Sequence, residues 1–494
     1  MAAIFLVSLF CLAIAYVAYY YWWVGKYPKG PTPIPLVGNI LTFDFENSHT
    51  YLQELSKQYG DVFTIFIPQP TVCVMTYEGM KDAFVTKGDD YLGRSGLFPD
   101  DIFQCIKNGG IVFSEGDDWR DARRTSLHIL RDYGMGSQQM DFQVRASMED
   151  CLCHLREMCA GDTPVNFRWP LQLFVGNVIS NVLFGLRYKY TDCEEVKKFC
   201  HLLTGEFVDM KENKYIFLPR LIPGFEKVPY FGHKASGQFK DMADQMYELV
   251  ERYVKVALKG YDPMVEADNF CQSYYQRKMK EGTYDEKKLL NICMDFYIAG
   301  METTSTTLRW AILFLTEHQD VQDKMRAEIE SVLGHNSPTL GDKSKLPYCN
   351  AVINEVQRKA NIVSNNAIHR TTKDTSVLNH FVPANSLIIA HIYNINASSS
   401  VFVNPEKFSP ERFLEEDGIK TKKEVAEQLV PFSLGKRQCA GEGLARLELF
   451  LCMTTLVQSF KLEKHPDHPL DFKPINGVVL LPRDPEVTIT PLKF

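Results

Sequence analysis

Apolar residues recur along most of this chain at three- and four-residue spacing, which is the period of a helix with one buried face. The clearest helices are predicted over Asp141–Met158, Asp241–Lys259, Asp285–Thr316 and His318–Leu333. Short β-type runs come early and late, at Val62–Ile67, Thr71–Thr76, Val377–Ile389 and Val478–Leu492. The pattern predicts a mainly α body with small β-sheets, and no linker divides it.

The N-terminal segment is apolar without interruption. Met1–Gly25 carries no charged side chain, and a helix over Ala2–Val24 would span roughly 35 Å, enough to cross a bilayer core of about 30 Å. Aromatic residues cluster at Tyr19–Trp23, and Lys26 and Lys29 follow. We therefore expect a single-pass anchor with the downstream chain in the cytosol.

A cleaved signal peptide is the alternative, because Ala13 and Ala15 form a cleavage-like pair. The segment has no basic start, however, and its apolar run continues well past Ala15, so the uncleaved anchor is favoured. The expected organisation is an anchor over residues 1–24, a stiff proline-rich connector over 25–40 and one globular domain over 41–494.

Composition narrows the class of protein. The chain of 494 residues is 45% hydrophobic and has a net charge of −7, whereas a nucleic-acid binder would usually carry a basic excess. Its 13 cysteines are odd in number and scattered. This arrangement favours reduced thiols facing the cytosol over a secreted disulfide framework.

The most informative stretch is PFSLGKRQCAG, residues 431–441, which precedes a predicted helix over Leu444–Phe460. Cys439 comes just ahead of that helix, where the helix dipole favours thiolate over thiol. Two glycines in the loop allow a tight turn close to a flat ligand, and an arginine offers a cation to an acidic group on it. Alone, Cys439 stays open among a buried thiol, a nucleophile and a metal ligand.

This loop resembles the ligand loop of the cytochrome P450 family, the haem-thiolate monooxygenases. The family has Phe, Gly, Arg, Cys and Gly at the offsets of Phe432, Gly435, Arg437, Cys439 and Gly441. The resemblance implies that Cys439 is the axial ligand of the iron of haem b. It also implies the family's fold, with the haem between a long central helix and the cysteine loop with its following helix.

The stretch GDDWRDARR has Trp119 and Arg123 four residues apart, hence on one face of a helix. Such a pair alone is usually surface packing. The resemblance implies that both side chains bind a haem propionate, and that Arg94 in YLGRSG does so as well.

The predicted helix Asp285–Thr316 contains AGMETT, followed by further hydroxyl residues that are mediocre helix formers. Ala299 and Gly300 present no bulk, so a ligand could approach the backbone there. Glu302 and Thr303 form an acid–alcohol pair that could relay protons to it. The resemblance implies that Thr303 donates a hydrogen bond to dioxygen and that Glu302 serves the proton path.

Two further motifs fit the same family. Glu355 and Arg358 are three residues apart, and Arg412 lies in the later segment PERF. The resemblance gives these three residues a structural role beneath the haem. The following stretch KANIVSNNAIHRTT departs from the family, which usually places prolines there. His369 best fits a propionate-binding position, with Arg370 as competitor.

The chain has no recognisable nicotinamide or flavin motif, so electrons from NADPH must come through a partner. The resemblance implies the membrane-bound NADPH-cytochrome reductase of the endoplasmic reticulum, with cytochrome b5 as a second candidate. We expect a basic docking surface for it, formed by Arg120, Arg124, Lys422, Lys423 and Lys436.

Family position also suggests an apolar pocket for a lipophilic substrate drawn from membrane lipid. Fatty acids, steroids and foreign compounds remain open as substrates. The candidate pocket residues are Phe98, Phe103, Ile111, Phe113, Phe207, Phe296, Ile298, Val363 and Val478. A haem sensor without turnover, or a haem-free scaffold, would leave the acid–alcohol pair or the cysteine loop without an explanation.

Overall fold

The computed structural model describes residues 1–133, 138–159, 163–206, 218–222, 224–398, 400–477 and 479–492. Its α-helices are α1 (Ala2–Val24), α2 (Ser48–Tyr59), α3 (Tyr77–Lys81), α4 (Gly116–Asp132), α5 (Gln138–Met158), α6 (Arg168–Phe184), α7 (Glu194–Cys200), α9 (Leu218–Leu221), α10 (Gln238–Leu258), α11 (Phe270–Glu281), α12 (Glu286–Glu317), α13 (Gln319–Leu333), α14 (Pro347–Ala360), α15 (Ile392–Asn396), α16 (Lys423–Ala426) and α17 (Glu442–Ser459). The mainly α architecture predicted from the hydrophobic pattern is confirmed.

The strands are short and belong to small sheets. They are β1 (Val62–Ile67), β2 (Gln69–Val74), β3 (Gly93–Arg94), β4 (Val165–Asn166), β5 (His369–Arg370), β6 (Thr375–Val377), β7 (His380–Val382), β8 (Leu387–Ala390), β9 (Phe460–Lys464), β10 (Ile475–Asn476), β11 (Leu480–Leu481) and β12 (Glu486–Pro491). The largest sheet has the order β1-β2-β8-β5-β3, with β2 and β8 parallel. Strand β2 begins earlier than predicted because Pro70 pairs with Phe66 in the antiparallel β1–β2 ladder.

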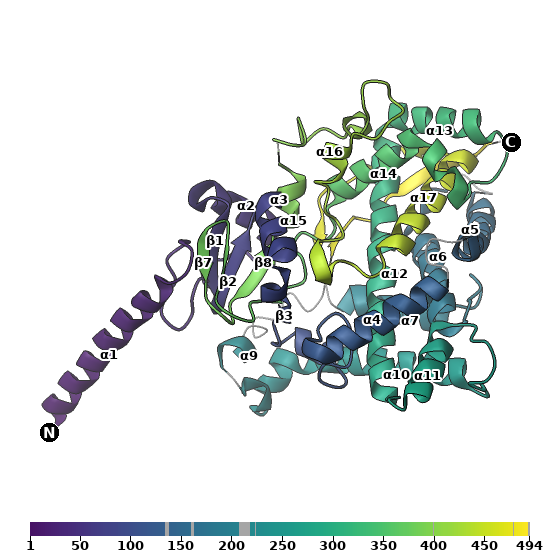
Figure 1. The fold of residues 1–494 in the computed structure, drawn as a ribbon. Helices are drawn as coiled ribbons and strands as arrows, with labels where there is room; N and C mark the ends of the chain where they lie inside the picture. The colour runs from purple at the N-terminus through teal and green to yellow at the C-terminus, as the bar shows by residue number, and fades with distance from the viewer. Residues whose placement is uncertain are drawn as a thin grey trace.

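Helix α12 runs through the helical half of the molecule, and the five-stranded sheet lies between that half and α1 (Figure 1). The Asp285 side chain caps its first turn by accepting from the backbone N–H groups of Lys287 and Lys288. Most of its residues are buried, and it packs against α6, α10, α14 and α17. Because other helices surround it, α12 can line an internal site on more than one of its faces.

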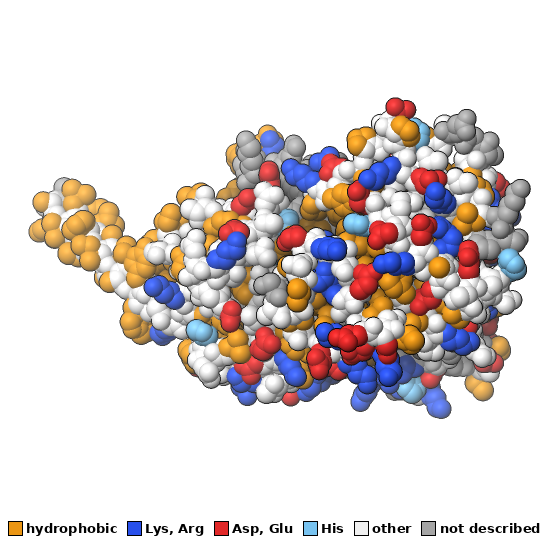
Figure 2. All heavy atoms as spheres, turned by 90° about the horizontal axis from the view of Figure 1, so that it is seen from above, with side chains coloured by type: hydrophobic (Ala, Val, Ile, Leu, Met, Phe, Trp, Pro, Cys, Tyr) orange, Lys and Arg blue, Asp and Glu red, His pale blue; other side chains and the backbone are white. Residues whose placement is uncertain are grey.

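Helix α1 has the bounds predicted for a helix over Ala2–Val24 and projects from the body as a rod of hydrophobic side chains (Figure 2). Within it, Ala3–Val24 is apolar and long enough to cross a membrane, and the most apolar 18-residue stretch of this span has no buried residue. The connector after it lies against β1, because Asn39 exchanges hydrogen bonds with the backbone of Phe66. A Cβ at Gly30 would collide with the carbonyl oxygen of Thr64, so this close approach requires glycine.

Candidate functional site

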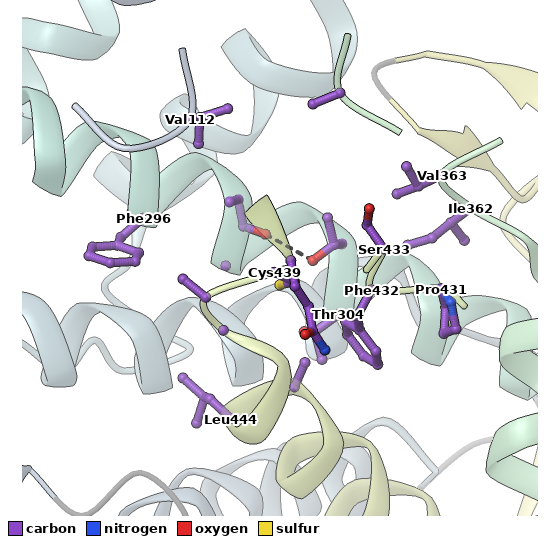
Figure 3. A pocket seen from close by; sticks show the side chains of 18 of the residues that line it. Val112, Phe296, Thr304, Ile362, Val363, Pro431, Phe432, Ser433, Cys439 and Leu444 are labelled. Carbon is purple, nitrogen blue, oxygen red and sulfur yellow. Dashed lines mark hydrogen bonds between the residues drawn. The ribbon is translucent and has the colours of Figure 1, made fainter. Parts of the chain in front are cut away.

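A cavity of about 350 Å³ lies between α12 and the loop that carries Cys439. Its walls come from distant parts of the chain: α4, α6, α12, the segment after α14, the cysteine loop and the start of α17. In Figure 3, Phe296 of α12 and Val363 of the segment after α14 lie on opposite sides of Cys439. The cavity therefore brings the two sequence motifs of residues 299–304 and 431–441 to one site.

The cysteine loop is tightly closed. The backbone N–H of Cys439 donates to the carbonyl oxygen of Phe432 at 3.0 Å. Gly435 has φ +78°, and a Cβ there would collide with the carbonyl oxygen of Phe84. At Gly441, by contrast, a Cβ would meet nothing within 4 Å. The loop thus leaves open space beside the cysteine, on the side of the cavity.

Helix α17 begins at Glu442, two residues before its predicted start, so Cys439 lies close to the helix N-terminus. The Cys439 side chain is exposed toward the cavity. Burial nevertheless raises its pKa, and the backbone N–H groups of Gly441 and Glu442 and the Arg123 cation only partly oppose this. The helix N-terminus thus favours the thiolate, as expected, but burial outweighs it, and a metal cation bound to the sulfur would favour the thiolate further.

Arginines from three segments line the cavity. Arg94 donates to the carbonyl oxygens of Val112 and Ala367, and Arg123 donates to that of Gln438 at 2.5 Å. Burial and mutual repulsion lower the pKa of Arg437 to about 8. Burial likewise lowers the pKa of Arg94 to about 10 and lowers that of Arg123. Such a cation cluster calls for an acidic ligand.

Two buried N–H donors without hydrogen-bond partners also indicate a ligand with acceptor atoms. Nε of Arg437 and Nε1 of Trp119 are buried and have no hydrogen-bond partner. Trp119 does not line the cavity itself but lies against Arg437. Because buried donors are almost always paired, these two N–H groups indicate a ligand with acceptors beside the cation cluster.

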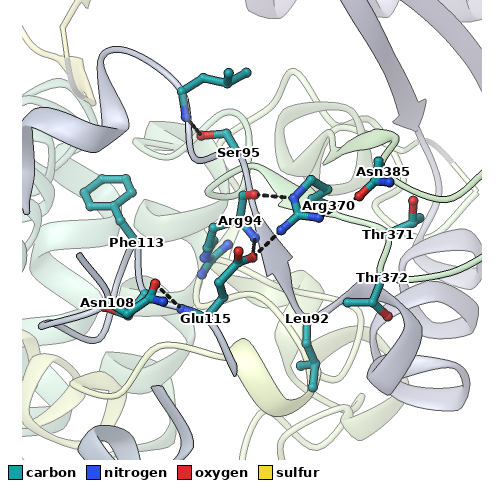
Figure 4. Close-up of polar contacts among 12 residues, drawn as sticks. Leu92, Arg94, Ser95, Asn108, Phe113, Glu115, Arg370, Thr371, Thr372 and Asn385 are labelled. Carbon is teal, nitrogen blue, oxygen red and sulfur yellow. Dashed lines mark hydrogen bonds and ion pairs between the residues drawn. The ribbon is translucent and has the colours of Figure 1, made fainter. Parts of the chain in front are cut away.

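His369 and Arg370 face different surroundings. His369 lines the cavity, its ring stacks on Phe84, and its Nδ1 lies 2.8 Å from the carbonyl oxygen of Tyr91. Burial and the neighbouring arginines hold its pKa well below the usual value. Arg370 instead pairs with Glu115 at 2.6 Å, and Glu115 also accepts from the backbone of Arg94 (Figure 4). Of the two candidates, only His369 reaches the cavity.

The AGMETT segment of α12 presents its residues to two sides. Ala299, Gly300 and Thr303 line the cavity, and Thr303 Oγ1 donates to the carbonyl oxygen of Ala299 at 2.8 Å. Glu302 is buried on another side, where its carboxylate accepts from Thr204 at 3.0 Å and Thr306 at 3.1 Å. Burial raises the pKa of Glu302. The acid and the alcohol are adjacent in sequence, but only the alcohol reaches the cavity.

The Glu355, Arg358 and Arg412 side chains form one buried ionic cluster. Arg358 donates to both carboxylate oxygens of Glu355, at 2.8 and 2.9 Å, and Arg412 donates to one of them at 3.1 Å. Both arginines also donate to backbone carbonyls within residues 403–407. The cluster ties α14 to the segment that leads toward the cysteine loop.

Of the candidate pocket residues, Ile111, Phe296 and Val363 line the cavity. Phe103 and Phe113 stack on each other at 5.9 Å, and neither they nor Phe98 or Ile298 line it. Phe207 and Val478 lie outside the described residues. The period of the hydrophobic pattern identifies buried positions but does not separate packed core from cavity wall.

The buried polar residues that line the cavity and went unpredicted include Asp295, Gln357, Asn361, Asn366 and Glu448. Asp295 Oδ2 accepts from the backbone N–H groups of Ile111 and Val112, and burial raises its pKa to about 6. Burial raises the pKa of Glu448 to about 8. A polar residue in an otherwise apolar helical face was the available signal for Asp295 and Glu448.

The expected basic docking surface is partly neutralised by its own neighbours. Arg120 pairs with Asp117 at 2.6 Å and Arg124 with Asp121 at 3.4 Å. Lys436 pairs with Asp89 at 2.5 Å. The pairs are exposed, so each contributes little to stability and can rearrange for a partner.

These residues fit a haem. Cys439 offers one sulfur donor, and no group of three or more metal-ligating side chains occurs among the described residues. A haem would supply the other donors to its iron from its own macrocycle. The open space at Gly441 and the unpartnered donors of Arg437 and Trp119 fit its flat edge and acidic groups.

Comparison with known proteins covers nearly the whole chain. The family model described as Cytochrome P450 matches residues 28–489. Similar proteins include Cytochrome P450 2C3 of Oryctolagus cuniculus and Cytochrome P450 2C26 of Mesocricetus auratus, each 34% identical with 95% of both chains covered. Cytochrome P450 2H2 of Gallus gallus is also 34% identical, with 94% of both chains covered.

Proposed function

The chain belongs to the cytochrome P450 family of monooxygenases, and we propose that it inserts one atom of dioxygen into a lipophilic small molecule, with electrons from NADPH supplied by a partner reductase. The observation that carries this proposal is that Cys439 and Thr303 line the same cavity beside a cluster of buried arginines. Such an enzyme needs three groups in one site: a sulfur that binds the iron, a hydroxyl that delivers protons, and cations that bind the acidic groups of the haem.

Haem b would bind with its iron on Cys439. Its propionates would lie among the cation cluster and the unpartnered donors, formed by Arg94, Trp119, Arg123, His369 and Arg437. Phe432 and Gly441 would flank the ring on the side of the cysteine loop. When bound, the haem supplies an iron that activates dioxygen, and the thiolate ligand favours cleavage of the O–O bond.

Thr303 and Glu302 divide the proton chemistry. Thr303 Oγ1 holds a proton at the cavity wall, in the bond to Ala299. Burial favours the protonated form of the Glu302 carboxyl, which is held by Thr204 and Thr306 behind the helix. We assign Glu302 as the proton store and Thr303 as the group that presents a proton to the cavity.

The substrate is drawn from the membrane. The apolar cavity residues Ile111, Phe296 and Val363 suit a fatty acid, a steroid or a foreign compound. Helix α1 and the connector over residues 25–40 would hold the haem domain, residues 41–494, on the cytosolic face of the endoplasmic reticulum. The partners there are the NADPH-cytochrome reductase and cytochrome b5, docking at Arg120, Arg124, Lys422, Lys423 and Lys436.

The carbon monoxide difference spectrum of the reduced, purified protein tests the proposal. A strongly red-shifted Soret band is expected, because it requires thiolate ligation. Cys439→His should abolish that band, whereas Cys153→Ser, at an exposed cysteine outside the cavity, should leave it unchanged. Folded, haem-loaded protein without the band would overturn the assignment.

A further inference from the structure

The proline-free segment between α14 and β5, residues 361–368, is held by hydrogen bonds. Three hydrogen bonds join its backbone to that of other segments. The N–H of Leu480 donates to the carbonyl oxygen of Ile362 (2.8 Å), that of Tyr393 donates to Ser364 (3.0 Å), and that of Asn366 donates to Ala390 (3.1 Å). The Arg94 side chain adds a bond to the carbonyl oxygen of Ala367 at 3.0 Å. A segment bonded at this many points presents its side chains in a defined direction.

Asn366 is the polar side chain of this segment that lines the cavity with a donor to spare. Its Oδ1 accepts from the backbone N–H of Ala390 at 2.7 Å. An N–H can only donate, so this bond also identifies which side-chain atom is oxygen and which is nitrogen. The residue is only 4% exposed, and its Nδ2 is buried with no hydrogen-bond partner.

Other unpartnered atoms of the cavity have a different character. Oε1 of Gln357 and Oε1 of Glu448 are acceptors, Nε of Arg437 belongs to the cation cluster, and Oγ of Ser433 is a hydroxyl of the cysteine loop that can donate or accept. Asn366 Nδ2 is a neutral donor on a segment whose other cavity residues include the apolar Ile362, Val363 and Ala367. A buried donor left unpaired costs about 1–3 kcal/mol, which a ligand acceptor would recover.

We propose that Asn366 is a specificity-determining residue that donates from Nδ2 to a neutral oxygen acceptor, a carbonyl or ether oxygen, on the lipophilic substrate. The inference rests on the proposed function and narrows its substrate class to lipophiles that carry such an acceptor. Hydrocarbons of the same shape fill the apolar walls but leave Nδ2 unpaired, and the site discriminates against them for that reason.

Two probes that differ in one group test this on the haem-loaded protein. Benzylacetone and butylbenzene share a skeleton, with a carbonyl in the first where the second has a methylene. We expect the dissociation constant of the ketone, measured by equilibrium dialysis at pH 8, to be about tenfold lower than that of the hydrocarbon. Asn366→Ala and Asn366→Asp should both remove this difference, the second while keeping the acceptor for Ala390.

Asn365→Ala is the matched control, because Asn365 is the neighbouring residue and does not line the cavity. It should keep the preference for the ketone. The inference is overturned if the wild-type protein binds both probes alike, or if the Asn366 variants keep the preference. It is also overturned if those variants lose haem while the ratio of the two constants stays the same, because Nδ2 would then serve the haem.

The carbon monoxide spectrum separates this inference from the proposed function. A red-shifted band with no discrimination between the probes leaves the monooxygenase assignment standing and removes the role of Asn366. Absence of the band in haem-loaded wild-type protein removes the proposed function itself, and the substrate inference falls with it.

Discussion

The guanidinium carbon of Arg437 lies 3.7 Å from the centre of the Trp119 ring. The two residues are far apart in sequence, yet each carries a buried N–H without a partner. Arg437 also donates to the carbonyl oxygens of Leu92 and Ser114, at 2.7 Å each, so its position does not depend on a ligand. The anion-binding edge of the cavity is therefore preformed.

Trp119→Phe should weaken haem retention while preserving the stack under Arg437. The phenyl ring fills the same space but removes the Nε1–H that we assign to a propionate. We expect haem transfer to apomyoglobin to accelerate by about tenfold, the value of one buried hydrogen bond to a charged group. Trp169→Phe, on α6, is the control and should not change the rate; equal rates in all three proteins would exclude the Nε1 contact.

Thr303→Ala should leave the carbon monoxide band intact and divert electrons from NADPH to hydrogen peroxide. The variant removes the only hydroxyl that we assign to presenting a proton in the cavity. The ratio of peroxide formed to NADPH consumed measures this. Ser305→Ala is the matched control, because Ser305 donates to the carbonyl oxygen of Met301 and does not line the cavity. Unaltered coupling in Thr303→Ala would remove the role proposed for it.

Glu355→Gln should destabilise the fold severely. The carboxylate is fully buried between two arginines, and removing its charge leaves two buried cations uncompensated, at a cost of about 3–5 kcal/mol. Urea titration of the purified protein should show the loss directly. Glu54→Gln breaks an exposed pair with Lys57 and should cost less than about 1 kcal/mol. Similar midpoints for the two variants would contradict the structural role.

Glu448 should make the protein less stable as the pH rises from about 5 to 8. Burial raises its folded-state pKa from 4.5 to about 8, so within that window the folded protein binds a proton that the unfolded chain has lost. Stability then falls by up to about 1.4 kcal/mol per pH unit. Glu448→Gln keeps a neutral polar group and should flatten the dependence of the unfolding free energy on pH, with its largest gain at pH 8. Parallel pH profiles for the two proteins would refute the assignment.

Reversal of Arg124 and Lys436 together, as Arg124→Glu with Lys436→Glu, should raise the Michaelis constant for the reductase several-fold. Each change places a carboxylate beside an existing one, Asp121 or Asp89, and so converts the proposed docking surface to an acidic one. The effect should shrink at high salt. Lys57→Glu, on α2, is the control. An unchanged constant for the double variant would reject this surface.

Local pattern was enough to predict the elements. Helix α1 and strand β1 have the predicted bounds, and α12 differs by one residue at each end because Asp285 is its cap. These elements have a strong period, and Asp285 as cap accounts for the N-terminal end of α12 alone. The start of strand β2 was not predicted, because proline has no backbone N–H and is uncommon within a sheet. Pro70 nevertheless pairs with Phe66 in the β1–β2 ladder.

The sequence by itself determined which chemical groups this protein carries, because the motifs around Thr303 and Cys439 depend on residue types at short, local spacings. It could not show which side of α12 the Glu302 carboxyl takes, nor that Arg370 pairs with Glu115 while His369 reaches the cavity. Those choices depend on residues far from each motif in sequence, because Thr204 is 98 residues from Glu302 and Glu115 is 255 residues from Arg370. The direction of the Asn366 side chain likewise depends on another element, because its Oδ1 accepts from the backbone N–H of Ala390 in β8. Only tertiary packing decides which polar atoms are left buried and unpaired, and those atoms indicate what the cavity binds.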